Sequence, residues 1–172
     1  LKLRADDHET ARGVSVALIA LVGASETLPD GGLRALVTVA GETLIERQAA
    51  RLADVGVTHI AVVVAAVPAD LIATCDRIQR RGIRVTPVRA AADLVAIVES
   101  DDRIILVADG LRASGTHYAA IAKPGSPAIL VTGDTVLTQA FERIDATRRW
   151  GGLAAISPPM VAELAAMPGE WD

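Results

Sequence analysis

The sequence Val14-Ser15-Val16-Ala17-Leu18-Ile19-Ala20-Leu21-Val22, which runs into Gly23-Ala24-Ser25, decides the fold of this chain. It is a continuous apolar run of strand length that contains several β-branched residues. This pattern is typical of a strand that is covered on both faces, because neither face then has to be polar. We therefore expect a central strand of a parallel sheet, followed by a long loop of small and turn-forming residues over 23–32.

Strand and helix patterns alternate along the rest of the chain. A helix is expected over 43–55, with Thr43 as its N-cap and Gly56 as its stop. The remaining expected strands cover 59–64, 83–87, 103–108, 128–132 and 152–156, and the remaining helices cover 68–82, 91–98, 116–122 and 159–167. Such alternation favours parallel neighbours joined by right-handed crossovers. The predicted fold class is a three-layer α/β/α, Rossmann-like domain with a mostly parallel sheet.

Composition narrows the class of protein. The hydrophobic fraction is 51% but the aromatic fraction only 2%, so small aliphatic side chains must fill the core. The formal charge of −4 is modest and its acids and bases are interspersed, which gives no footprint for nucleic acid. No apolar run approaches the ~18 residues of a membrane span. A single domain over 1–172 is expected, although a chain that begins with Leu1 is also compatible with a fragment of a longer protein.

The single cysteine, Cys75, cannot form an internal disulfide, so the sequence is compatible with a reducing, cytoplasmic compartment. Its place in a helical apolar pattern predicts a buried small hydrophobic residue. The histidines His8, His59 and His117 lack the spacing of a zinc site, and no Ser/His/Asp order suggests a hydrolytic triad. We expect His59, at a strand start, to be structural.

Candidate site residues follow from the expected sheet. In an open parallel sheet, ligands bind beyond the carboxyl ends of the strands. The loop after the first strand offers Gly23, Ala24 and Ser25, whose backbone N–H groups carry little side-chain bulk and could approach a phosphate closely. Asp109 and Gly110 follow the apolar strand that ends at Ala108. A carboxylate there could bind magnesium, but an Asp-Gly pair is equally typical of a plain turn.

Three segments carry a resemblance to a known family. They are Leu21-Val22-Gly23-Ala24-Ser25, the run from Gly32 to Gln48 (GLRALVTVAGETLIERQ) and Gly56-Val57-Thr58-His59-Ile60-Ala61-Val62-Val63. Over about residues 14–110 the chain resembles the MobA-like or GT-A-like nucleotidyltransferases, which activate sugar phosphates and related alcohol phosphates. The resemblance implies a nucleotide-diphospho-sugar transferase fold. It also implies attack of an acceptor phosphate on the α-phosphorus of a nucleoside triphosphate, with release of pyrophosphate.

The resemblance also implies roles for residues. Gly23, Ala24, Ser25 and Gly110 would contact the nucleotide, Arg34 would neutralise phosphate charge, and Asp109 would bind magnesium. A second metal-binding acid is expected late in the fold, with Asp145 as first candidate and Asp134 as second, although the charged neighbours of Asp145 favour a surface role. The implied partners are a nucleoside triphosphate, a small phosphorylated acceptor and a second copy of the chain in a homodimer.

Two positions depart from the family pattern. The family usually has an arginine in the glycine-rich loop and a lysine ahead of the next motif, where this chain has Glu26 and Arg34. Arginine and lysine differ in geometry at phosphate sites, and Glu26 would repel phosphate. An alternative is therefore a catalytically silent domain that acts in nucleotide binding, regulation or partner interaction. A third hypothesis is an unrelated doubly wound binding domain, since fold does not fix function.

Overall fold

The computed structural model describes residues 17–125, 127–139 and 141–166. Six strands form one sheet in the order β5-β4-β1-β6-β8-β7, and β2 pairs with β3 in a small hairpin. The strands are β1 (Leu18–Gly23), β2 (Thr38–Val39), β3 (Glu42–Thr43), β4 (His59–Val63), β5 (Arg84–Val88), β6 (Arg103–Val107), β7 (Ala128–Gly133) and β8 (Arg148–Ile156). The helices are α1 (Leu44–Asp54), α2 (Ala69–Gln79), α3 (Ala91–Ile97), α4 (Gly115–Ile121) and α5 (Pro158–Ala166), with short 3-10 turns η1 (Arg34–Leu36) and η2 (Val136–Thr138).

The strand β1 lies in the middle of the sheet, as its sequence predicts. It pairs in parallel with β4 on one side and β6 on the other. Ala20 and Val22 contribute to the larger core cluster and Leu21 to the smaller one, so the strand is buried on both faces. The first part of the predicted run, 14–16, lies outside the described residues.

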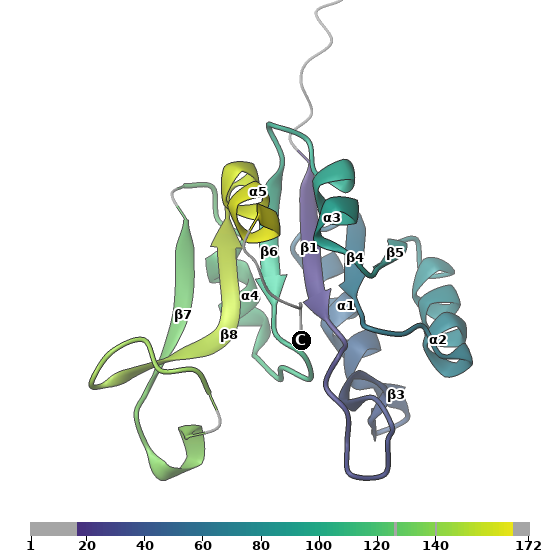
Figure 1. Cartoon of the computed structure of the whole chain (residues 1–172), viewed down its shortest axis with the longest axis horizontal. Helices are drawn as coiled ribbons and strands as arrows, with labels where there is room; N and C mark the ends of the chain where they lie inside the picture. Colours follow the sequence, from purple (N-terminus) through teal and green to yellow (C-terminus); the bar gives the residue numbers. More distant parts are fainter. Residues whose placement is uncertain (1–16, 126, 140, 167–172) are drawn as a thin grey trace, which may run out of the picture.

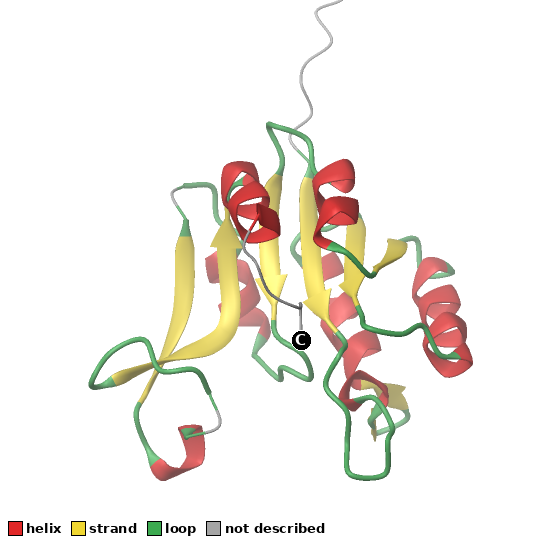
Figure 2. Cartoon of the chain, viewed as in Figure 1, coloured by secondary structure: helices red, strands yellow, loops and turns green. Residues whose placement is uncertain are grey.

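Helices cover both faces of the sheet (Figures 1 and 2). The larger cluster joins buried side chains of α1, α2 and α4 to the sheet, and Cys75 is among them. The smaller cluster lies beneath α3 and α5, where Leu94 and Val161 are almost fully buried. The predicted three-layer α/β class with a mostly parallel sheet is confirmed. His59 is also buried, and its Nε2 lies 2.9 Å from the Thr86 hydroxyl.

One part of the predicted topology is wrong. The expected strand over 128–132 forms β7 and runs in the same direction as β6, but β8, over the expected strand 152–156, lies between them and runs antiparallel to both. The reason lies in the connection over 134–147, where η2 is the one helical turn among the described residues. An antiparallel pair can be joined by a hairpin, whereas a parallel pair needs a crossover.

Among the described residues, no helix has the length and apolar character that crossing a bilayer requires.

Candidate functional site

The candidate site is built on two neighbouring loops at the carboxyl edge of the sheet. Val22 of β1 is in register with Val107 of β6, so the loops that follow these strands leave the sheet side by side. Their contact is close: a Cβ added to Gly23 would lie 3.1 Å from the backbone nitrogen of Asp109. A larger residue at position 23 would therefore push the Asp109 loop away. The sequence predicted both loops, and the structure brings them together.

The loop after β1 is held in a folded-back conformation by its backbone. The Ala24 N–H donates to the Val63 carbonyl at 2.9 Å, which ties the loop to the end of β4. Further along, Thr27 bridges Leu33 in antiparallel fashion, and the Arg34 N–H donates to the Glu26 carbonyl at 2.8 Å. The loop over 24–34 thus returns on itself and places Arg34 beside its own beginning.

Asp109 has one engaged oxygen and one without a partner. Its Oδ2 accepts the Glu26 backbone N–H at 2.7 Å. Its Oδ1 is buried and has no hydrogen-bond partner among the described residues. Burial raises the pKa of Asp109 to about 6, and the nearby Glu26 carboxylate contributes in the same direction. An acid with a buried, unsatisfied oxygen and a raised pKa is a common sign of a functional site.

Arg34 lies over Gly110 and is paired with Glu26. The Arg34 Nη1 is 2.5 Å from the Glu26 carboxylate. A Cβ added to Gly110 would come within 2.5 Å of the Arg34 Cδ, and Gly110 also has a positive φ of 62°. The glycine therefore allows Arg34 to reach the site. The sequence indicated that Glu26 would repel phosphate. In the structure its charge is balanced by Arg34, while roughly half of each side chain remains exposed.

Gln48 is a site residue that the sequence reasoning missed. It is buried in α1, and its Nε2 donates to the carbonyls of Ala108 and Leu111, each at 3.1 Å. These two carbonyls flank Asp109 and Gly110, so the Gln48 amide fixes the position of the loop that carries both residues. The available signal was a glutamine on the apolar face of a predicted helix, between Ile45 and Leu52. A buried amide needs hydrogen-bond partners, and here a distant loop supplies them.

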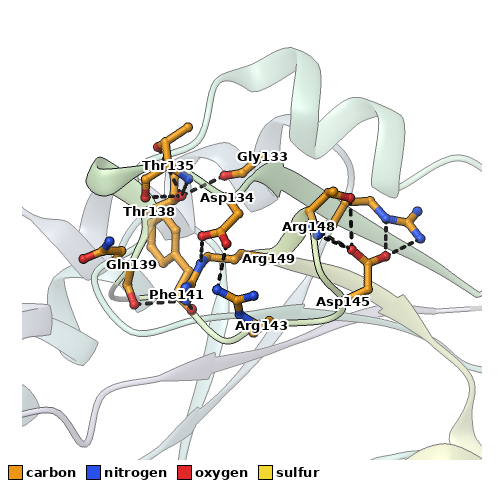
Figure 3. Close-up of polar contacts among 11 residues, drawn as sticks. Gly133, Asp134, Thr135, Thr138, Gln139, Phe141, Arg143, Asp145, Arg148 and Arg149 are labelled. Atoms are coloured by element: carbon orange, nitrogen blue, oxygen red, sulfur yellow. Dashed lines mark hydrogen bonds and ion pairs between the residues drawn. The ribbon is translucent and has the colours of Figure 1, made fainter.

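Asp145, the candidate second metal ligand, lies in the connection between β7 and β8, where its carboxylate is already engaged (Figure 3). Its Oδ1 accepts the backbone N–H groups of Thr147 and Arg148 at 2.9 and 2.8 Å, and its Oδ2 accepts the Arg148 Nε at 2.7 Å. These bonds hold the pKa of Asp145 down at about 2. The contacts are those of a residue that shapes a turn, and none of them joins it to Asp109.

Asp134, the other late acid, is also paired within the same hairpin. It accepts Arg143 and Arg149, each at 2.7 Å, and the Arg149 guanidinium also donates to the carbonyls of Gln139 and Phe141 (Figure 3). Its hydrogen bond with Arg149 lowers the pKa of Asp134. Both late acids therefore stabilise the hairpin.

A magnesium ion would find one available carboxylate here. Among the described residues, no three His, Cys, Asp or Glu side chains gather as a metal cluster. The unpartnered, buried Oδ1 of Asp109 is a hard oxygen ligand of the kind that magnesium prefers. Magnesium in proteins is often bound by one or two carboxylates together with substrate phosphates and water. The residues present fit an ion that enters with a phosphorylated substrate, with Asp109 as its protein ligand.

Comparison with proteins of known structure identifies the fold. No protein-family model matches the sequence, and no curated protein matches it. Among solved structures, the chain is similar to a UDP-glucose pyrophosphorylase complexed with UDP-glucose, with a TM-score of 0.62 and 9% identity over 90% of this chain and 81% of that one. This chain has the nucleotidyltransferase fold. The resemblance predicted from sequence is thus confirmed for the fold.

Other structures with the nucleotidyltransferase fold agree. A CMP:2-keto-3-deoxy-manno-octonic acid synthetase complexed with CTP has a TM-score of 0.59 and 15% identity, over 90% of this chain and 80% of that one. A 4-diphosphocytidyl-2C-methyl-D-erythritol synthase from Anaerococcus prevotii has a TM-score of 0.60 and 14% identity, over 90% of this chain and 78% of that one. At these identities the similarity concerns the backbone architecture, so function has to be argued from the site.

Proposed function

We propose that this protein is a nucleotidyltransferase that transfers a nucleotidyl group from a nucleoside triphosphate to a sugar phosphate or related alcohol phosphate. An oxygen of the acceptor phosphate forms a bond to the α-phosphorus, and the bond from that phosphorus to the bridging oxygen breaks, so that pyrophosphate leaves. The observation that carries the proposal is the buried Oδ1 of Asp109, which has no hydrogen-bond partner among the described residues and lies beside the Gly23 loop and Arg34. The nucleotidyltransferase fold supports it.

The residues of the chain would act by binding and positioning. The small residues Gly23, Ala24 and Ser25 would let a nucleotide phosphate approach their loop closely, although the Ala24 N–H itself is bonded to the Val63 carbonyl. Gly110 would leave room for Arg34 to reach the phosphates. Arg34 would exchange its pairing with Glu26 for a phosphate group, two oxygens of which can accept parallel N–H bonds from a guanidinium. Asp109 would bind magnesium, which when present neutralises phosphate charge. Phosphate transfer depends mostly on such positioning and charge neutralisation.

The proposal includes the partners and the compartment expected from the sequence. The protein would bind a nucleoside triphosphate and a small phosphorylated acceptor, act in the cytoplasm and form a homodimer. The single, buried Cys75 supports a cytoplasmic location, because a chain with one cysteine can form no internal disulfide and does not depend on an oxidising compartment.

A second candidate is a catalytically silent nucleotide-binding domain. The observation that favours it is that the other charged groups already have partners: Arg34 is paired with Glu26, and both carboxylate oxygens of Asp145 accept hydrogen bonds within its own turn. Under this alternative, nucleotides would bind without turnover.

The test compares binding and turnover in matched variants. Thermal stability is measured with each of the four nucleoside triphosphates, with and without magnesium. A ligand at about 100 times its Kd should add ~2.7 kcal/mol of stability. The stabilising nucleotide is then assayed for pyrophosphate release with a set of phosphorylated acceptors. Asp109→Asn should abolish release, whereas Asp101→Asn, an exposed acid at the opposite end of β6, should not.

Each outcome decides between the candidates. Magnesium-dependent stabilisation with pyrophosphate release that Asp109→Asn removes supports the transferase. Stabilisation without release for any acceptor supports the silent domain. Full release from Asp109→Asn would overturn the assignment of Asp109, and the absence of stabilisation by every nucleotide at millimolar concentration would overturn both candidates.

A further inference from the structure

A hollow lies between α1 and the segment that leads from β6 into α4. Its volume is about 480 Å³, within the range of small-molecule sites. Its lining comes from the first turns of α1, from residues 111–114 and from Tyr118 of α4. Asp109 does not line it. Gln48, which lines the hollow, is bonded to the Ala108 and Leu111 carbonyls on either side of Asp109 and Gly110.

The lining is basic. Arg47 and Arg51 lie one helical turn apart on the same face of α1, and Arg112 reaches the hollow from the loop. The lining includes one acid, Glu42, which is itself paired with Arg81 at 3.1 Å. Arg47 donates one hydrogen bond to the Val39 carbonyl, and Arg51 has a long contact of 3.4 Å with Asp54. Each guanidinium carries five N–H donors, so most of their capacity remains for an anion.

Two buried polar atoms in the lining lack partners among the described residues. They are the hydroxyl of Tyr118, a residue that is 1% exposed, and the Oε1 of Gln48, a residue that is 2% exposed. An unsatisfied buried polar atom costs free energy, so such atoms usually have a partner. Burial raises the pKa of Tyr118 to about 12, so its hydroxyl stays protonated and can donate. Gln48 Oε1 is an acceptor and needs a donor.

These requirements define a ligand. The three arginines and the Tyr118 hydroxyl call for an anion rich in acceptor oxygens, and Gln48 Oε1 calls for a hydroxyl group. A phosphate ester of a sugar or polyol supplies both. We propose that the hollow formed by Arg47, Arg51, Arg112, Gln48 and Tyr118 is a binding site for a small phosphorylated sugar or polyol, separate from the candidate nucleotide site. Gln48 is also hydrogen-bonded to the loop of Asp109. A ligand bonded to Gln48 would therefore be linked to that loop through the Gln48 side chain.

The experiment is isothermal titration of the ligand-free protein with glucose 6-phosphate and, separately, with inorganic phosphate, in EDTA so that no magnesium is present. The wild type should bind both, and glucose 6-phosphate more tightly because it carries hydroxyl groups. The double variant Arg47→Ala, Arg51→Ala should lose at least about tenfold in affinity, and Tyr118→Phe about three- to tenfold. Arg80→Ala, at an exposed arginine just after α2, should stay within about twofold.

Arg34→Ala separates this proposal from the proposed function. If the hollow is the site, Arg34→Ala binds like the wild type whether or not the protein is a transferase. Binding that is lost in Arg34→Ala but kept in the double variant would place the anion at the nucleotide site and overturn the proposal. So would equal losses in the double variant and in Arg80→Ala, or no binding by the wild type at millimolar concentration. Tyr118→Phe removes an unpartnered hydroxyl, so it should keep the wild-type Tm and report on binding alone.

Discussion

At the scale of single residues, two acids of this fold carry opposite pKa shifts for different physical reasons. Burial raises the pKa of Asp109 to about 6, and this effect outweighs the lowering of the pKa by the Glu26 N–H and the Arg34 guanidinium. The hydrogen bond from Arg77 lowers the pKa of Glu46 to about 2, although Glu46 is also buried. Asp109 is thus left available to a ligand, whereas Glu46 is committed to the fold.

Glu46 joins a helix cap to an ion pair. Its Oε2 accepts the backbone N–H and the hydroxyl of Thr43 at 2.9 and 2.7 Å, which completes a capping box. Its Oε1 accepts the Arg77 Nε at 2.8 Å. One carboxylate therefore fixes the start of α1 and attaches α1 to α2. Because α1 carries Gln48, this position also supports the loop of Asp109.

We expect Glu46→Gln to lower the free energy of unfolding by about 1–2 kcal/mol at neutral pH. Since the pKa in the folded protein is depressed from 4.5 to about 2, the charge of Glu46 contributes stability above pH 4.5 that is lost as the pH falls toward 2. The difference between wild type and variant should therefore shrink over this range. Urea unfolding at stepped pH measures it.

Glu42→Gln is the matched control, because Glu42 pairs with Arg81 in an exposed ion pair that should contribute about 0–1 kcal/mol. Equal losses in the two variants at neutral pH, or a Glu46→Gln effect that does not change with pH, would contradict the assignment.

The residues of the candidate site differ in how far the sequence could predict them. Gly23 and Asp109 follow apolar strand patterns directly, so their meeting at one sheet edge could be predicted. Gln48 could not be assigned a role in this way, because its partners lie about sixty residues away and depend on how the β6 loop turns. The turn role of Asp145 depends on backbone geometry that its charged neighbours do not encode.

At the scale of elements, prediction succeeded where the local signals agreed. The helix expected over 43–55 forms as α1 because the Thr43 cap, the Glu46 capping partner and the apolar face all specify the same start and face. The C-terminal strands were predicted less accurately: β8 begins at Arg148 rather than at the predicted residue 152. Its first residues are charged, since they pair with the acids of the hairpin rather than with the core.

The β7–β8 hairpin should open independently of the rest of the sheet when Arg149 is removed. Arg149 is 9% exposed and bonds Asp134 and two hairpin carbonyls, so Arg149→Ala leaves several polar groups unpaired. Hydrogen exchange of amides over 134–150 should accelerate about tenfold or more, while amides of β1 and β4 keep their rates.

Arg148→Ala provides the control, since Arg148 is largely exposed and its side chain pairs with Asp145 alone among the described residues. It should accelerate exchange far less. The hairpin would not be a separate unit if Arg149→Ala accelerated exchange in β1 and β4 as well.

At the scale of the whole molecule, the two faces of the sheet are covered unequally. The α1, α2 and α4 side carries the larger core cluster, and Leu130 of β7 packs against it. On the other side, α3 and α5 lie over the middle of the sheet (Figure 1), and β7 at the edge exposes Ile129 and Val131. The alternating exposure along β7 indicates that both side chains point to the same, uncovered face.

This face leads to a prediction about assembly. An edge strand that presents unpaired backbone groups and apolar side chains is suited to contact with another chain. The connection between β7 and β8 adds Val136, which is 81% exposed, together with Phe141 and Ile144.

We expect the protein to sediment as a homodimer joined through the β7–β8 hairpin. The double variant Ile129→Lys, Val131→Lys should convert it to a monomer without loss of helical signal. Ile72→Lys, at an exposed apolar residue of α2, should remain dimeric. A wild type that sediments as a monomer at micromolar concentration would refute the dimer, and dissociation by Ile72→Lys alone would move the interface to α2.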